Sequence, residues 1–222
     1  MEQGFPRIEP EVVQVGAGVT ATEITLGGVP RGAIIVLCDA GRLSDAAEPM
    51  NGLAEHGYES VAAEVSGGAG DVVGSLLAHL GARGWEAEQV GVIGYGAGGR
   101  AALLTAAEFT LGAAVTIAPD GPVSDPREPL RTPWLGLFGG DAAGLRRLGE
   151  TLYERSPVYT EVVCYPAAGS GFHRDSAEAP VHAAAFDSWQ RTVEWLNLRV
   201  VPRLTPLARA WRARQPAGVG IP

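Results

Sequence analysis

The stretch Val90-Gly-Val-Ile-Gly-Tyr-Gly-Ala-Gly-Gly-Arg100 decides the fold of this chain. It opens with an apolar run of strand length, and a helical pattern follows within a few residues. A very sharp turn from a strand into a helix needs a residue with unusual backbone dihedral angles at the bend. Gly96 stands at that bend, and glycine reaches positive φ without penalty. We therefore expect a sharp strand-to-helix turn that lacks a side chain at its apex.

On both sides of this stretch, short apolar runs alternate with segments of helical periodicity. The alternation predicts an α/β fold, with a mostly parallel, twisted eight-stranded sheet and helices on both faces. The expected strands are 12–15, 23–26, 33–37, 60–64, 90–94, 113–117, 134–138 and 161–165, and the expected helices are 45–56, 71–82, 98–108, 143–155 and 179–198. Ligands of such sheets gather at the carboxyl ends of the strands, so the turns at that edge are the candidate site.

Composition divides the chain into a domain over residues 1–198 and an Arg/Pro-rich C-terminal arm over residues 199–222. The arm holds five arginines and no acid, which leaves a net charge of −13 on residues 1–198. We expect either a solvated extension with a short helix near 207–214, or an arm in which Trp211 and the arginines clamp onto an acidic face of the same or a neighbouring subunit. A homodimer is one assembly that the second alternative allows.

Composition also excludes several classes of function. An acidic body argues against a nucleic-acid partner, and the longest apolar runs are too short to cross a bilayer. Cys38 and Cys164 are the two cysteines, which gives no disulfide framework and no zinc spacing. The chain has no lysine, so Schiff-base chemistry is excluded. We expect a cytoplasmic protein that binds a small molecule and needs no metal or cofactor.

Residues 94–100 resemble the dienelactone hydrolase family, whose members carry Gly-Tyr-Cys-x-Gly-Gly-Arg after such a strand. Residues 133–141 look like the family's strand that ends in the triad aspartate, and residues 165–175 are similar to its Tyr-Pro-Gly-Ala-x-His-Gly-Phe segment. The resemblance runs over most of residues 8–198. It implies an α/β-hydrolase fold without a large cap domain.

The resemblance also implies an incomplete catalytic triad. Gly96 takes the nucleophile position, Ser170 the histidine position, and Asp141 the retained aspartate. His173, three residues after Ser170, is the remaining candidate for proton transfer. Tyr95 and Phe172 are expected in the same pocket. Alternatively, Asp141 caps a turn or helix, and His173 is a hydrogen-bonded loop residue.

Cys38-Asp39 stands where the family usually has a His-Glu pair after its third strand. The backbone amides of Ala97 and of the turn at Asp39 are the expected oxyanion donors, since that role needs amides and no side chain. Cys38 lies near the expected pocket and would act as a nucleophile only as a thiolate. Its simpler interpretation is an apolar filler at a strand end.

These observations leave four functions open. The first is a repurposed enzyme for a non-hydrolytic step on a small carbonyl or lactone, namely a cyclisation, elimination, isomerisation or addition, in which Asp141 or His173 moves protons. The second is a catalytically inactive ligand-binding or regulatory relative of hydrolases. The third is a weak carboxylic ester hydrolase that uses Cys38 or a bound water. The fourth is a dinucleotide-binding protein, because Gly94-x-Gly96-x-x-Gly99 satisfies a phosphate-binding pattern and Asp120 follows the next strand.

Overall fold

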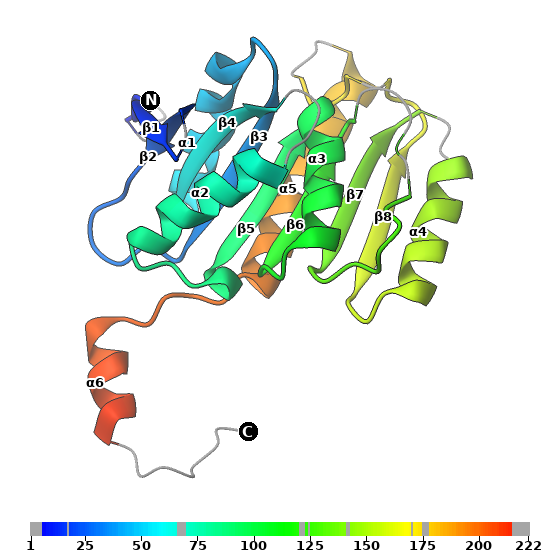
Figure 1. Ribbon diagram of the computed structural model, residues 1–222. Coiled ribbons are helices and arrows are strands. Elements are labelled where there is room, and N and C mark those ends of the chain that lie inside the picture. Colours follow the sequence, from blue (N-terminus) through cyan, green and yellow to red (C-terminus); the bar gives the residue numbers. More distant parts are fainter. Residues whose placement is uncertain are drawn as a thin grey trace.

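A computed structural model describes residues 6–16, 18–65, 70–119, 123, 125–140, 143–169, 171–174 and 178–214. Within these residues, eight strands form one sheet in the order β1-β2-β4-β3-β5-β6-β7-β8 (Figure 1). The strands are β1 (Glu11–Val15), β2 (Val19–Ile24), β3 (Gly32–Asp39), β4 (Tyr58–Val65), β5 (Val90–Tyr95), β6 (Ala113–Ile117), β7 (Trp134–Gly139) and β8 (Thr160–Tyr165). From β4 to β8 all neighbours in the sheet are parallel, and β2 runs antiparallel to both of its neighbours.

Helices cover both faces of the sheet (Figure 1). The covering helices are α1 (Ala47–Glu55), α2 (Gly70–Ala82), α3 (Ala97–Glu108), α4 (Ala143–Arg155) and α5 (Ala179–Arg199), whereas α6 (Pro206–Arg214) lies apart from the sheet (Figure 1). Buried side chains of α2, α3 and α4 form one core cluster, and those of α1 and α5 form a second cluster on the other face. Strand β3 is buried on both faces, as a parallel strand between two helical layers must be. The expected α/β-hydrolase architecture is confirmed, and no large cap domain is present among the described residues.

The predicted strand at 23–26 was wrong in its position. Strand β2 ends at Ile24 and begins at Val19, because Gly16 and Gly18 adopt positive φ and turn the chain back on β1 as a hairpin. The hairpin pairs Val15 with Val19. The other strands and the long helices lie within three residues of their expected bounds, although the helix expected at 45–56 begins with a 3₁₀ turn, Leu43–Ala46.

The turn between β5 and α3 has the geometry that the sequence predicted. Gly96 has φ +57° and ψ −122°. Glycine is also required two residues later, because a Cβ on Gly98 would collide with the backbone carbonyl of Leu37 on β3. The glycines of this segment therefore serve the sharp turn and the close approach of α3 to the sheet.

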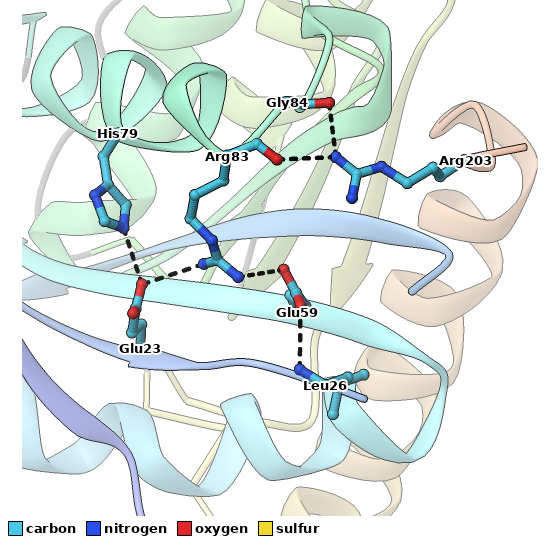
Figure 2. A network of polar contacts seen from close by, with 7 residues as sticks. All are labelled: Glu23, Leu26, Glu59, His79, Arg83, Gly84 and Arg203. Atoms are coloured by element: carbon cyan, nitrogen blue, oxygen red, sulfur yellow. Dashed lines mark hydrogen bonds and ion pairs between the residues drawn. The ribbon is translucent and has the colours of Figure 1, made fainter. Parts of the chain in front are cut away.

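The beginning of the C-terminal arm is fixed on the body of the same chain (Figure 2). The Arg203 guanidinium donates to the carbonyls of Gly84 (2.6 Å) and Arg83 (3.2 Å), and it lies 3.7 Å from the ring centroid of Trp85. Beyond this anchor, α6 has no buried residue, and Trp211 is 51% exposed. The short helix is confirmed, and a contact of the arm with a second copy stays a prediction.

None of the helices in the described part of the chain is both long enough and apolar enough to span a bilayer.

Candidate functional site

A cavity of about 1160 Å³ opens at the carboxyl edge of the sheet, beside the turn at Gly96. Its inner end is lined by residues from three places in the sequence: Cys38 and Asp39 at the end of β3, Tyr95 and Gly96 at the end of β5, and His173 after β8. The structure thus brings together five residues that the sequence singled out separately. This follows from the parallel order β3-β5, since the carboxyl ends of neighbouring parallel strands meet at one edge.

The carboxylate of Asp39 lies directly over Gly96. The Ala97 amide, at the N-terminus of α3, donates a hydrogen bond to Asp39 Oδ1. A Cβ built on Gly96 would lie 2.6 Å from Oδ1 and 2.8 Å from Cγ of Asp39. The carboxylate therefore occupies the space that a side chain at the apex would need. It also engages the amide that the sequence assigned as an oxyanion donor, and a helix N-terminus is a favourable place for a negative charge.

The turn after Asp39 is held by a neighbouring strand. Glu64, on β4, accepts a hydrogen bond from the Leu43 amide at 2.9 Å. Backbone hydrogen bonds from Gly41, Leu43 and Arg42 hold the pKa of Glu64 below its ordinary value. The Arg42 amide donates in turn to the Asp39 carbonyl at 3.1 Å. Glu64 thus fixes the backbone of the turn that follows Asp39, a contact between β4 and this turn that the sequence analysis did not find.

Cys38 is buried beside this carboxylate and is 6% exposed. Burial raises the pKa of its thiol to about 12, and the negative charges of Asp39, Asp45 and Glu64 act in the same direction. A nucleophilic cysteine needs a nearby cation or base that stabilises the thiolate, and the surroundings here favour the thiol. The geometry supports the apolar-filler interpretation of Cys38.

His173 lines the cavity as a neutral imidazole. Burial lowers its pKa to about 4, with Arg174 and Arg42 acting in the same direction and Asp39 opposing them. Its ring lies 5.3 Å from the ring centroid of Tyr95, and its Nδ1 is buried without a hydrogen-bond partner among the described residues. Because a buried polar atom without a partner is costly, this nitrogen is the group of the site most in need of a ligand.

Phe172 does not line the pocket, although the sequence analysis expected it there. It is 1% exposed and packs against Tyr165, with ring centroids 4.8 Å apart, in the core cluster under α1 and α5. Phe172 is taken into the core while the adjacent His173 lines the cavity. Three further residues of the sequence analysis, Asp120, Asp141 and Ser170, lie outside the described residues.

The Asp39 carboxylate also bears on the dinucleotide alternative. A pyrophosphate would sit at the N-terminus of α3, where the Ala97 amide already meets a negative charge from the chain itself. The glycines that suggested this alternative are explained by the packing of α3 on the sheet. Within the described part of the chain, no group of three His, Cys, Asp or Glu side chains is arranged to hold a metal ion.

The sequence profile of the dienelactone hydrolase family matches residues 69–199, more than half of the chain. The chain belongs to this family.

Curated relatives of this dienelactone hydrolase family chain include two enterobacterial proteins assigned as carboxymethylenebutenolidases. The protein from Salmonella typhimurium is 32% identical over 127 residues, which are 50% of this chain and 47% of the relative. The protein from Escherichia coli K12 is 31% identical over 129 residues, which are 51% and 48% of the two chains. The matched segment thus spans about half the length of these relatives.

Solved structures of the same fold include a Klebsiella pneumoniae protein assigned as a dienelactone hydrolase and the dienelactone hydrolase of Anabaena variabilis. The first has a TM-score of 0.66 at 22% identity and covers 85% of this chain and 98% of its own. The second has a TM-score of 0.58 at 20% identity and covers 88% and 100%. Esterase 2 of Thermogutta terrifontis has a TM-score of 0.66 at 16% identity, covering 87% and 95%. At these identities the likeness shows the fold.

The sequence analysis missed the charged and aromatic residues that complete the cavity of this family member. Arg42 and Arg174 line it near His173, and Trp189 and His182 line it from α5. Arg174 follows His173 directly, so its position was the one signal available in the sequence. The contributions of α5 depend on how that helix packs across the sheet.

Proposed function

We propose that this chain binds a small carbonyl- or lactone-type molecule in the cavity over Gly96 and acts on it by proton transfer, without an acyl-enzyme intermediate. The observation that carries the proposal is the Asp39 carboxylate, which occupies the place of a side chain at the apex of the turn. An acyl transfer needs a nucleophile there, and glycine offers none. A carboxylate in the same place offers a base.

Asp39 and His173 have complementary properties for such a step. A carboxylate base beside a neutral imidazole is a known arrangement for removing a proton next to a carbonyl, because the imidazole N–H polarises the carbonyl oxygen while the carboxylate takes the proton. The lowered pKa of His173 keeps its ring neutral at pH 7. Proton abstraction of this kind initiates isomerisations, eliminations and cyclisations. Asp141, outside the described residues, is the proposed further partner in the pocket.

The proposal is tested by the exchange of α-protons in deuterium oxide, followed by NMR. The probes are α-angelica lactone and 2-coumaranone, two small lactones with acidic α-protons. We expect exchange above the buffer rate in the unmodified chain, and a loss of about 100-fold or more in Asp39→Asn, the usual contribution of a general base. Exchange at the buffer rate, or exchange that Asp39→Asn leaves unchanged, would contradict the proposal. Cys164→Ser, on β8, is the matched control.

A second candidate function is ligand binding without turnover. It is favoured by the Ala97 amide, since a bound carbonyl finds this donor already engaged by Asp39. Thermal stabilisation by a lactone that undergoes no exchange or hydrolysis would favour this candidate. Hydrolysis through Cys38 is a weaker alternative, because the raised pKa of its thiol opposes thiolate formation.

A further inference from the structure

The cavity extends well beyond the Asp39 carboxylate, outward between α1 and α5. We call this part the outer groove and define it by Ala47, Asn51, Gly52, Ala185, Phe186 and Trp189. His182, Ala185, Phe186 and Trp189 all line the cavity, and their spacing of three and four residues puts them on one face of α5. Regular elements on both sides give the outer groove fixed walls.

Two aromatic side chains, Phe186 and Trp189, line the outer groove. A Cβ on Gly52 would lie 2.6 Å from Cζ2 of Trp189, so the indole lies directly on the backbone of α1. Phe186, next to it on α5, is 63% exposed and still lines the cavity. An exposed aromatic ring at the side of a cavity is a common mark of a binding surface, since leaving it in water is unfavourable.

The polar side chain within the outer groove is already satisfied by the protein. Asn51 accepts a hydrogen bond from the Ile8 amide at 2.7 Å, and its Nδ2 donates to the carbonyls of Ile8 (2.9 Å) and Ala47 (2.8 Å). These contacts tie the N-terminal segment to α1. They leave Asn51 with little need of a polar partner from a ligand.

Charged side chains lie around the outer groove with mixed signs. Glu48 and Glu55 are exposed on α1, and Arg7 lines the cavity from the N-terminal segment. Such a rim favours neither a strongly anionic nor a strongly cationic group in the groove. The volume of about 1160 Å³ also exceeds the ~300–1,000 Å³ usual for pockets that hold drug-sized ligands, so a small lactone at Asp39 would leave the groove empty.

We propose that the outer groove is a binding subsite for a flat, uncharged apolar group, so that the molecules bound here are aryl or fused-ring carbonyl compounds. The carbonyl end lies at Asp39 and His173, and the ring system lies against Phe186 and Trp189. This inference rests on the proposed function for the position of the carbonyl end. The affinity of the ring system for the groove is independent of any proton transfer.

The test uses prodan, an uncharged naphthyl ketone whose emission shifts to shorter wavelength in apolar surroundings. Phe186→Ser removes the exposed wall, and Ala185→Phe fills the groove. The control is Leu198→Ser, on the same helix, which removes a side chain that is 79% exposed and does not line the cavity. Circular dichroism and thermal unfolding of each variant verify that the fold is retained.

We expect saturable binding of prodan to the unmodified chain, a Kd raised about 5- to 10-fold in Phe186→Ser, and a comparable or larger loss in Ala185→Phe. Leu198→Ser should bind as the unmodified chain does. Absence of saturable binding, or equal affinity in all three variants, overturns the subsite. Groove-dependent binding of prodan together with no α-proton exchange of any lactone overturns the proposed function and leaves the subsite standing.

Discussion

Carboxylates at the two edges of the sheet have different partners. At the edge where the parallel strands begin, Glu59 and Glu23 are both held by Arg83, at 2.7 Å and 3.2 Å, and His79 adds a contact to Glu23 at 2.9 Å (Figure 2). At the edge where the strands end, the Asp39 carboxylate accepts a hydrogen bond from the backbone amide of Ala97, and no cationic side chain of the described residues forms an ion pair with it.

The difference separates carboxylates that are paired with cations from a carboxylate that lines a cavity. Arg83 links the end of α2 to β2 and β4, and the Glu59 carboxylate also accepts a hydrogen bond from the Leu26 amide at 3.1 Å, so both carboxylates here have partners. Asp39 lines a cavity, and a polar group left with few partners in a cavity is a candidate for chemistry.

The largest effect is expected for the reactivity of Cys38 at the cavity edge. With its pKa raised to about 12, its thiolate fraction at pH 8 falls about 10³-fold below that of an ordinary cysteine. Iodoacetamide should therefore alkylate Cys164→Ser, which retains Cys38, far more slowly than Cys38→Ser, which retains the half-buried Cys164. Mass spectrometry gives both rates. Equal rates would show that burial and the neighbouring negative charges do not raise the pKa of the Cys38 thiol.

The next effect is expected at the paired edge. Arg83→Met leaves Glu59, 5% exposed, and Glu23 without their shared cation, and loss of one partner from a buried pair destabilises by about 3 kcal/mol. Urea unfolding measures the change. Arg191→Met, which breaks the half-exposed pair with Asp187, should cost less than about 1 kcal/mol. Equal losses in the free energy of unfolding for the two variants would show that the Arg83 contacts do not stabilise the fold.

A smaller loss of stability is expected when a side chain is restored at the apex. Gly96→Ala forces a Cβ onto the Asp39 carboxylate at positive φ, and we expect a cost of about 2 kcal/mol in urea unfolding. Gly28→Ala has φ +81° with open space around the Cβ, so it measures the backbone strain alone. Gly96→Ala should therefore cost more than Gly28→Ala. The double variant Gly96→Ala/Asp39→Ala should regain this difference in the free energy of unfolding, because the carboxylate that meets the Cβ is gone. Purely additive costs would mean that the carboxylate does not occupy the apex.

The smallest effect is a dependence of stability on pH that His173 supplies. Its pKa is about 4 in the folded chain and ordinarily about 6.5, so between these values the unfolded chain binds the extra proton. The contribution of neutral His173 is complete above pH 6.5 and declines as the pH falls towards 4. Between pH 7 and 5 we expect a loss of about 1–2 kcal/mol that is absent in His173→Phe. The control is His56→Phe, which replaces an exposed histidine. Its stability should show the same dependence on pH as that of the unmodified chain.

The sequence predicted what depends on local pattern. The apolar runs located the strands, and Gly96 gave the positive-φ turn, because both signals lie within a few residues. The Asp39 carboxylate was not predicted at the apex, since its direction depends on a rotamer and on the pairing of β3 with β5. The pairing of Glu23 with Arg83 was not predicted, because it joins β2 to the end of α2 and depends on how these elements pack. The outer groove depends on α1 and α5 packing on the same face, which no local pattern encodes.

Intact-mass spectrometry after reaction with p-nitrophenyl acetate and an acid quench tests most directly whether the cavity lacks a nucleophile. We expect no acetyl group on any residue of the cavity, because Gly96 has no side chain and the raised pKa of Cys38 keeps its thiol protonated. Gly96→Cys combined with Asp39→Ser restores a thiol in open space and should become acetylated at position 96. The contrary result is a stoichiometric acetyl adduct on a cavity residue of the unmodified chain, formed and released at the rate of product formation. It would show that the cavity does contain a nucleophile.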